Sequence, residues 1–177
     1  IAAAAGALSA MFLGWFPVGN PQLPWALNGS LAGLVAITAP CAFVTPFEAI
    51  IIGAVGGIVM YLGVNFLERR GVDDVVGAVS VHGFGGVWGT LAVGLFHGEL
   101  GLLHGGGAGQ LVTQVIGIVA VAAFTIIAAA IIFYILKVIG WLRASREGEL
   151  LGLDIYEHGM VAYPEFTNSP SEPVASS

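Results

Sequence analysis

Long apolar runs constrain this chain more than any other feature. Five of them follow one another, at residues 1–16, 25–39, 46–67, 75–96 and 110–142. Runs of about 18 or more apolar residues are typical of helices that cross a membrane. Only 9% of the residues are charged, whereas a soluble domain contains about a quarter. The sequence therefore predicts an all-α integral membrane protein with five transmembrane helices.

The pattern inside these runs is helical. Residues 50–52 and 128–132 are continuously apolar, whereas the strands of a membrane barrel alternate. Pro17 is expected to break the first helix, and Pro46 suits the first turn of the third. Pairs of glycines four residues apart let helix backbones approach closely and predict a packed bundle; they are Gly29 with Gly33, Gly53 with Gly57, and Gly85 with Gly89.

The basic residues predict the topology. If the fourth and fifth runs each cross the membrane once, all five basic residues fall on one side, which the positive-inside rule makes cytoplasmic; they are Arg69, Arg70, Lys137, Arg143 and Arg146. We expect residues 1–146 to be the transmembrane part. Residues 147–177 form a cytoplasmic tail, disordered after about residue 167 because it is rich in serine and proline.

The ends and composition of the chain limit its function further. The chain begins with an apolar run and without a basic flank, so we expect a fragment whose earlier helices are missing. The net charge of −6 argues against a nucleic-acid partner. One cysteine, Cys41, allows no disulfide within the chain. No nucleophile elbow, zinc-binding helix or phosphate-binding loop is present, so we expect neither an enzyme nor a cofactor.

His82 is the strongest candidate for a functional side chain. It lies inside the fourth apolar run, where an ionisable residue is costly unless it faces a cavity or a partner. Gly86 and Gly89 follow at helical spacing and are expected to leave open space beside the imidazole. A histidine that only joins two helices by a hydrogen bond is the alternative.

Other polar residues flank the same run. Asp73 and Asp74 precede it, where carboxylates cap a helix N-terminus; ion binding is the alternative. His97, Glu99 and His104 follow it. Their spacing matches no established metal motif, so a solvated loop is expected there.

Three stretches together resemble the ammonium transporter family, Amt/Mep/Rh, and specifically its Amt/Mep branch. The first covers residues 28–42, from Asn28-Gly29-Ser30 to Pro40-Cys41-Ala42. The second covers residues 73–90 and includes the aspartate pair and Val81-His82-Gly83. The third lies in the tail and contains Gly152, Asp154, His158, Gly159 and Tyr163.

The resemblance implies that this chain is the C-terminal part of an eleven-helix transporter. Such proteins are homotrimers in membrane lipid, and each subunit moves ammonium or ammonia through its own hydrophobic pore. His82 matches the second of two pore histidines, while the first belongs to the missing half. Leu31 and Ala78 match positions of the pore wall, and Ala78 is smaller than the branched residue often found there.

The resemblance also implies a location and a regulatory partner. The protein is expected in the plasma membrane, or the inner membrane of a bacterium, with many spans and a cytoplasmic C-terminus. The tail resembles a regulatory segment that in many bacteria helps present the pore to a PII-type signalling protein. Two other functions remain alternatives: an ammonium sensor that signals through its tail, and a membrane subunit with only a packing role.

Overall fold

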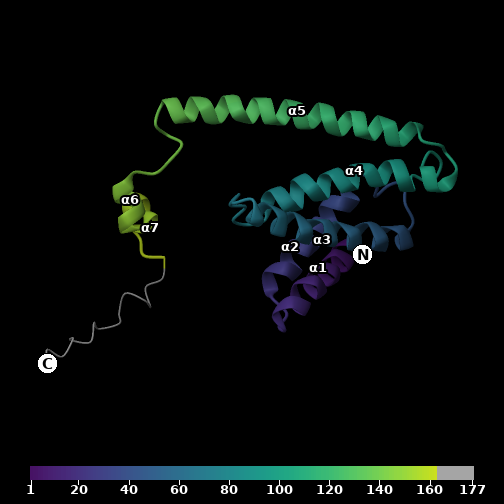
Figure 1. The fold of residues 1–177 in the computed structure, drawn as a ribbon, viewed down its shortest axis with the longest axis horizontal. Coiled ribbons are helices and arrows are strands. Elements are labelled where there is room, and N and C mark those ends of the chain that lie inside the picture. Colours follow the sequence, from purple (N-terminus) through teal and green to yellow (C-terminus); the bar gives the residue numbers. More distant parts are fainter. Residues whose placement is uncertain (163–177) are drawn as a thin grey trace. The chain divides into compact units, whose positions relative to one another are not determined.

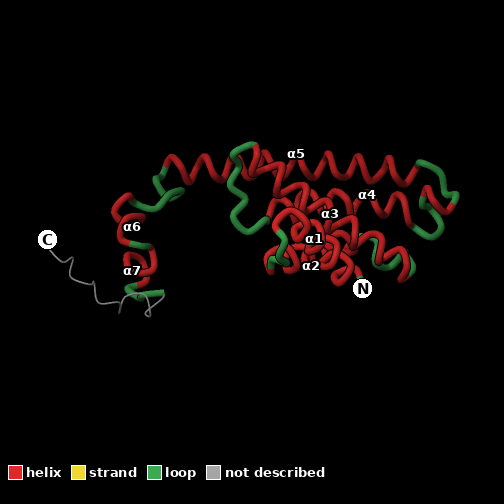
Figure 2. Tube along the Cα trace, turned by 60° about the horizontal axis from the view of Figure 1, so that its bottom comes forward, coloured by secondary structure: helices red, strands yellow, loops and turns green. Residues whose placement is uncertain are grey.

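The computed structural model describes residues 1–162, and its regular elements are all helices, with no strand in that range (Figures 1 and 2). The predicted disorder after about residue 167 lies outside the described residues. The elements in chain order are α1 (Ala2–Val18), α2 (Leu23–Thr38), α3 (Pro46–Arg69), the π-helix η1 (Val79–Phe84), α4 (Gly85–Phe96), the 3-10 turn η2 (Leu102–His104), α5 (Gly109–Val138), α6 (Arg146–Leu151) and α7 (Leu153–His158).

Three of the five apolar runs form helices long enough to cross a membrane. They are α3 with 24 residues, η1 joined to α4 with 18, and α5 with 30. At about 1.5 Å per residue, each approaches or exceeds the hydrocarbon thickness of about 30 Å. The shorter apolar helices α1 and α2 have 17 and 16 residues. The all-helical prediction is confirmed, whereas the number of five spans stays a prediction.

Helix α1 ends two residues later than its prolines predict. Pro17 lies inside the helix, which continues to Val18 and stops where Gly19 adopts the left-handed conformation at φ 82°. The Gly19 amide donates to the Trp15 carbonyl, closing the helix with a glycine C-cap. The prediction that Pro17 breaks the helix is therefore wrong. Pro24 likewise lies within the first turn of α2, the part of a helix that tolerates proline.

Helix α3 begins at a capping box. The Thr45 hydroxyl oxygen accepts from the Glu48 amide, and the Glu48 carboxylate accepts from the Thr45 amide at 2.7 Å. This exchange satisfies two donors that a helix start otherwise leaves unpaired. Pro46 follows as the first helical residue, as its sequence position predicts.

Glycines let α1, α2 and α3 pack with their backbones close together. A β-carbon at Gly6 would meet the backbone of Gly29 on α2 and of Gly53 on α3. A β-carbon at Gly33 would meet Ala2. The pairing of residue 2 with 33 and of residue 6 with 29 makes α1 and α2 antiparallel. The packed bundle that the glycine spacing predicts is confirmed.

Helices α2 and α4 run parallel to each other. Gly85 lies beside Ala32, and Gly89 lies against the backbone of Ala36, one turn further on both helices. Met60, Val81 and Ile52 are among the largest fully buried side chains. The Trp88 indole donates to the Ile52 carbonyl at 2.9 Å and ties α4 to α3. The first compact unit, Ile1–Ala123, has its core among α1, α2, α3 and the helix that η1 and α4 form together.

Helix α5 has no buried residue. A helix that is apolar on every side suits lipid or further helices rather than water. Residues from Phe124 onward belong to a second compact unit, whose described part includes α6 and α7. There the Ser145 hydroxyl accepts from the Gly148 amide and caps α6, and Arg143 pairs with Glu149 at 2.9 Å.

Candidate functional site

His82 lies in the π-helical turn η1, and its side chain is exposed. A π turn inserts one extra residue into a helix, which rotates the preceding side chains by about 100° relative to those that follow. No hydrogen bond involves the His82 side chain within residues 1–162. The imidazole is therefore available to an external partner, with one nitrogen able to donate and the other to accept.

The π turn alters the surroundings that the sequence predicts for His82. Gly86 has only Val35 near the position of a β-carbon, at 3.9 Å. Gly89 instead packs against the backbone of Ala36. The space at Gly89 is thus occupied by another helix, α2, whereas the space at Gly86 stays largely open.

Leu31 and Ala78, the two predicted wall residues, are exposed, as His82 is. Leu31 lies one turn before Val35 on α2, and Val35 lies beside Gly86 of α4. On α2, Gly29 and Gly33 face α1, so Leu31 lies on the flank away from α1. Leu31 is 49% exposed, which leaves this apolar flank open.

Ala78 lies just before η1. It is exposed and precedes His82 by four residues. On the side of η1 that faces α3, Phe84 and Ser80 lie against Gly63. We call the exposed set Leu31, Ala78 and His82 the histidine face.

Asp74 holds the start of η1. One carboxylate oxygen accepts from the Val79 amide at 3.1 Å, and the other accepts from the Ser80 amide and hydroxyl, each at 3.0 Å. Gly77, at φ 73°, forms the turn that lets the aspartate reach these donors, a conformation that favours glycine. The carboxylate thereby pairs with donors at the N-terminal end of the helix, where negative charge is favourable.

Hydrogen bonding lowers the pKa of Asp74. Burial raises the pKa of this carboxyl, but hydrogen bonds from the Val79 and Ser80 amides, the Ser80 hydroxyl and the Ala78 amide outweigh burial. Asp73 is exposed, and its side chain makes no hydrogen bond within the described part of the chain. The two neighbouring aspartates thus differ: only Asp74 contacts η1.

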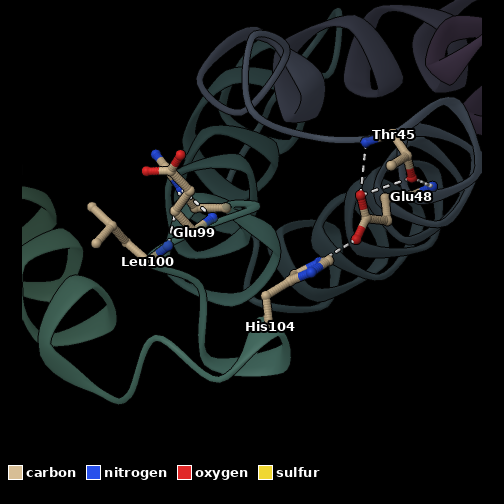
Figure 3. Close-up of polar contacts among 6 residues, drawn as sticks. Thr45, Glu48, Glu99, Leu100 and His104 are labelled. Atoms are coloured by element: carbon tan, nitrogen blue, oxygen red, sulfur yellow. Dashed lines mark hydrogen bonds and ion pairs between the residues drawn. The ribbon is translucent and has the colours of Figure 1, made fainter.

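Histidines tie the loop after α4 to the start of α3 (Figure 3). The His104 Nε2 atom lies 2.6 Å from a carboxylate oxygen of Glu48, the same side chain that completes the capping box. His97 stacks on Phe43, with ring centroids 4.5 Å apart. Most of the loop is exposed, as the sequence predicts, and its two histidines also contact residues at or just before the start of α3.

His97 and His104 each join the loop after α4 to other residues by direct contacts. The His97 Nδ1 atom accepts from the Glu99 and Leu100 amides, each at 3.2 Å. Residues 1–162 contain no group of three or more potential metal ligands.

A sequence profile of the Ammonium Transporter Family matches residues 1–163. The chain belongs to this family. It is 44% identical to ammonium transporter Amt2 of Archaeoglobus fulgidus, over 97% of this chain and 39% of that protein. It is 41% identical to an ammonium transporter of Bacillus subtilis, over 93% of this chain and 42% of that protein. The chain thus spans about two fifths of the length of these relatives.

Solved structures agree with the family assignment. The structure titled "Sensor Amt Protein" matches with a TM-score of 0.80 and 34% identity, over 88% of this chain and 39% of that one. The crystal structure of Candida albicans Mep2 matches with a TM-score of 0.77 and 28% identity, over 99% of this chain and 41% of that one. The predicted resemblance to the Amt/Mep branch is confirmed, and this ammonium transporter chain belongs to a membrane-embedded family.

The tail motif of this ammonium transporter chain forms two short helices. Gly152, at φ 96°, joins α6 to α7, and Gly159, at φ 60°, ends α7. The Ala162 amide donates to Asp154 at 2.9 Å, and this hydrogen bond lowers the pKa of the Asp154 carboxyl. His158 is exposed at the end of α7. Tyr163, the last predicted tail residue, lies outside the described residues.

Proposed function

We propose that this chain is the C-terminal part of an eleven-helix transporter that moves ammonium or ammonia across the membrane. The family profile over residues 1–163 supports the substrate class. The observation that carries the proposal is the exposed His82 in its π turn, together with the exposed apolar side chains of Leu31 and Ala78. Such a face is suited to line a narrow pore once the remaining helices of the transporter cover it.

The physical chemistry of the substrate explains why an apolar pore would carry a histidine. An ammonium cation loses its hydration in an apolar passage, which costs many kcal/mol. Potassium has a similar size and charge, so size alone discriminates poorly between the two. Removing the proton solves both problems, because neutral ammonia crosses apolar surroundings at lower cost. His82, with the pore histidine of the other half, would offer hydrogen bonds to ammonia and a route for the proton.

The helix directions and the basic residues support a cytoplasmic side for one end of the bundle. Helix α3 ends at Arg69, and the parallel helices α2 and η1 begin at that same end of the bundle. The basic residues beside this end make it cytoplasmic by the positive-inside rule. We place the protein in the plasma membrane, or the inner membrane of a bacterium, as a homotrimer.

The tail is the part we assign to regulation. Its two short helices carry Gly152, Asp154, His158 and Gly159 in defined turns. Turns of fixed geometry at the cytoplasmic side are suited to hold the tail in one shape against a PII-type protein. No catalytic role is proposed, because the relatives are named transporters.

The decisive experiment measures ammonium-triggered currents and uptake of labelled methylammonium in proteoliposomes that contain the full-length transporter. His82→Ala should change the rate of transport or its selectivity against potassium. Val79→Ala is the matched control, because it shortens another exposed side chain of the same π turn without removing an imidazole. The control should transport like the wild type.

Three outcomes separate the possible functions. Transport that changes only in His82→Ala supports a pore histidine. Transport and potassium exclusion that are the same in both variants would remove His82 from the mechanism. A well-folded wild type without current or uptake would favour the sensor, and deletion of residues 152–177 would then abolish its signal.

A further inference from the structure

One glycine of α3 receives both ends of the π turn that carries His82. A β-carbon at Gly63 would lie 2.7 Å from the Phe84 ring and 3.3 Å from the Ser80 β-carbon. Ser80 precedes His82 by two residues, and Phe84 follows it by two. The bare backbone of α3 at this position therefore contacts η1 on both sides of the histidine, while the histidine face stays exposed.

The two ends of the turn are held differently. Ser80 is 0% exposed, and the Asp74 carboxylate accepts hydrogen bonds from its amide and from its hydroxyl, each at 3.0 Å. Phe84 has an apolar ring, which is held by packing: it lies against Gly63 and meets the Phe66 ring edge to face, with centroids 6.4 Å apart. A change at position 63 would thus displace the Phe84 end of the turn.

The hydrogen bonds of the turn define the register that orients His82. The Gly85 amide donates to the Ser80 carbonyl, five residues back, as in a π-helix, and also to the His82 carbonyl. In an α turn the same amide would donate to the Val81 carbonyl, four residues back. Closing the turn in this way would rotate His82 by about 100° relative to α4, and the imidazole would point in another direction.

Only glycine leaves room for Phe84 in this register. Carbons of different residues pack at about 3.5–4.0 Å, whereas a β-carbon at Gly63 would meet the Phe84 ring at 2.7 Å. The ring would have to move by about 1 Å. Because a π turn is a locally unfavourable conformation, it persists only where its surroundings stabilise it. A displacement at one end is therefore enough to change its register.

We propose that Gly63 is a positioning residue for His82. By receiving Phe84 on bare backbone, it keeps η1 in the π register and fixes the direction in which the imidazole meets the substrate. The contact lies on the side of η1 that faces α3, so Gly63 acts through the backbone of the turn and does not touch ammonium or ammonia. This inference rests on the proposed function, in which His82 lines the pore.

A pair of glycine variants in the full-length transporter tests the proposal. Gly63→Ala adds a methyl group that meets η1, whereas Gly56→Ala adds one that meets the Ala36 β-carbon of α2 at 2.8 Å. Both variants overpack α3, so thermal unfolding should show similar losses of stability. Only Gly63→Ala should lower methylammonium uptake in proteoliposomes, by about ten-fold, because misplacing a reacting group by about 1 Å can cost up to about a hundred-fold. Equal uptake by the two folded variants would overturn the proposal.

A second comparison tests the contact itself. Phe84→Val removes the ring from Gly63 and should also lower uptake. Combining Gly63→Ala with Phe84→Val should recover most of the lost uptake, because the added methyl group then fills the place of the ring. A double variant that transports no better than Phe84→Val alone would overturn the proposal, and this comparison holds even if Gly63→Ala by itself does not assemble.

NMR of the imidazole nitrogens in histidine-labelled transporter measures the positioning without transport. The signals of His82 are assigned by their loss in His82→Ala. They should shift in Gly63→Ala and stay in place in Gly56→Ala. If His82→Ala leaves transport unchanged, the proposed function fails and the NMR comparison alone decides the positioning. A His82 signal that responds equally to both glycine variants would then overturn it.

Discussion

Replacing Asp74 by alanine should loosen the turn that carries His82. The carboxylate accepts three hydrogen bonds, and two of their donors belong to Ser80, which is 0% exposed. A buried donor left unpaired costs about 1–3 kcal/mol. The Val79 amide belongs to an exposed residue and can bind water. The Ser80 hydroxyl can rotate toward a carbonyl of the preceding turn, so we expect a total of about 2–3 kcal/mol.

Amide hydrogen exchange of the full-length transporter in nanodiscs measures this effect locally. Because every 1.4 kcal/mol is about a factor of ten, peptides that cover residues 75–84 should exchange about 30- to 100-fold faster in Asp74→Ala. Asp73→Ala is the matched control: it removes the same charge one residue earlier, from a side chain that makes no hydrogen bond in the described part. Its effect should stay within about 0.5 kcal/mol. Equal exchange rates in the two variants would refute the reasoning.

The pH dependence of the same contact follows from the sign of the shift. The pKa of Asp74 lies below its ordinary value of 3.8 in the folded protein. Its stabilisation is therefore complete above the ordinary pKa and is lost only as the pH falls through the lower, folded pKa. Exchange of residues 75–84 should show no effect of Asp74 titration between about pH 5 and 8. Acceleration at pH 5 that is absent from Asp74→Ala would contradict the assignment.

Three further substitutions test the packing of the bundle and its loop. Gly6→Leu should prevent assembly of α1 with α2 and α3, because a β-carbon there meets the backbones of Gly29 and Gly53; size-exclusion chromatography of the detergent extract should show aggregated protein, and a normal trimer peak would contradict the packing. His104→Ala should destabilise the protein by about 0.5–1.5 kcal/mol, the net value of one hydrogen bond, in thermal unfolding. Glu48→Ala should cost more, since it also removes the capping box, and a larger loss in His104→Ala would refute this order.

Composition and hydrophobic pattern predict the helical part of the fold because these features act over long stretches. In apolar runs of membrane length, the backbone amides and carbonyls find hydrogen-bond partners only within the same segment. Such runs therefore form helices. Glycine spacing predicts close packing for the same local reason. The end of α1 was missed because Pro17 can occupy a last turn, where Gly19 supplies the stop. Such competition between two neighbouring stop signals depends on backbone geometry that a residue pattern does not contain.

The candidate site is less predictable, because its geometry depends on one inserted residue. A regular helix would place Gly86 and Gly89 on the face of His82, but η1 contains a π turn. The residue types at positions 79–84 do not predict that turn. Contacts from outside the turn stabilise it: the Asp74 carboxylate, which precedes the turn, and Gly63 of α3. The contact of His104 with Glu48 is unpredictable for a similar reason, because Glu48 precedes His104 by 56 residues.

Contacts from outside the π turn stabilise the segment that carries His82. Asp74 binds the amide end of η1, and Gly63 receives the Phe84 ring. Since a π turn is a locally unfavourable conformation, it persists only where its surroundings stabilise it.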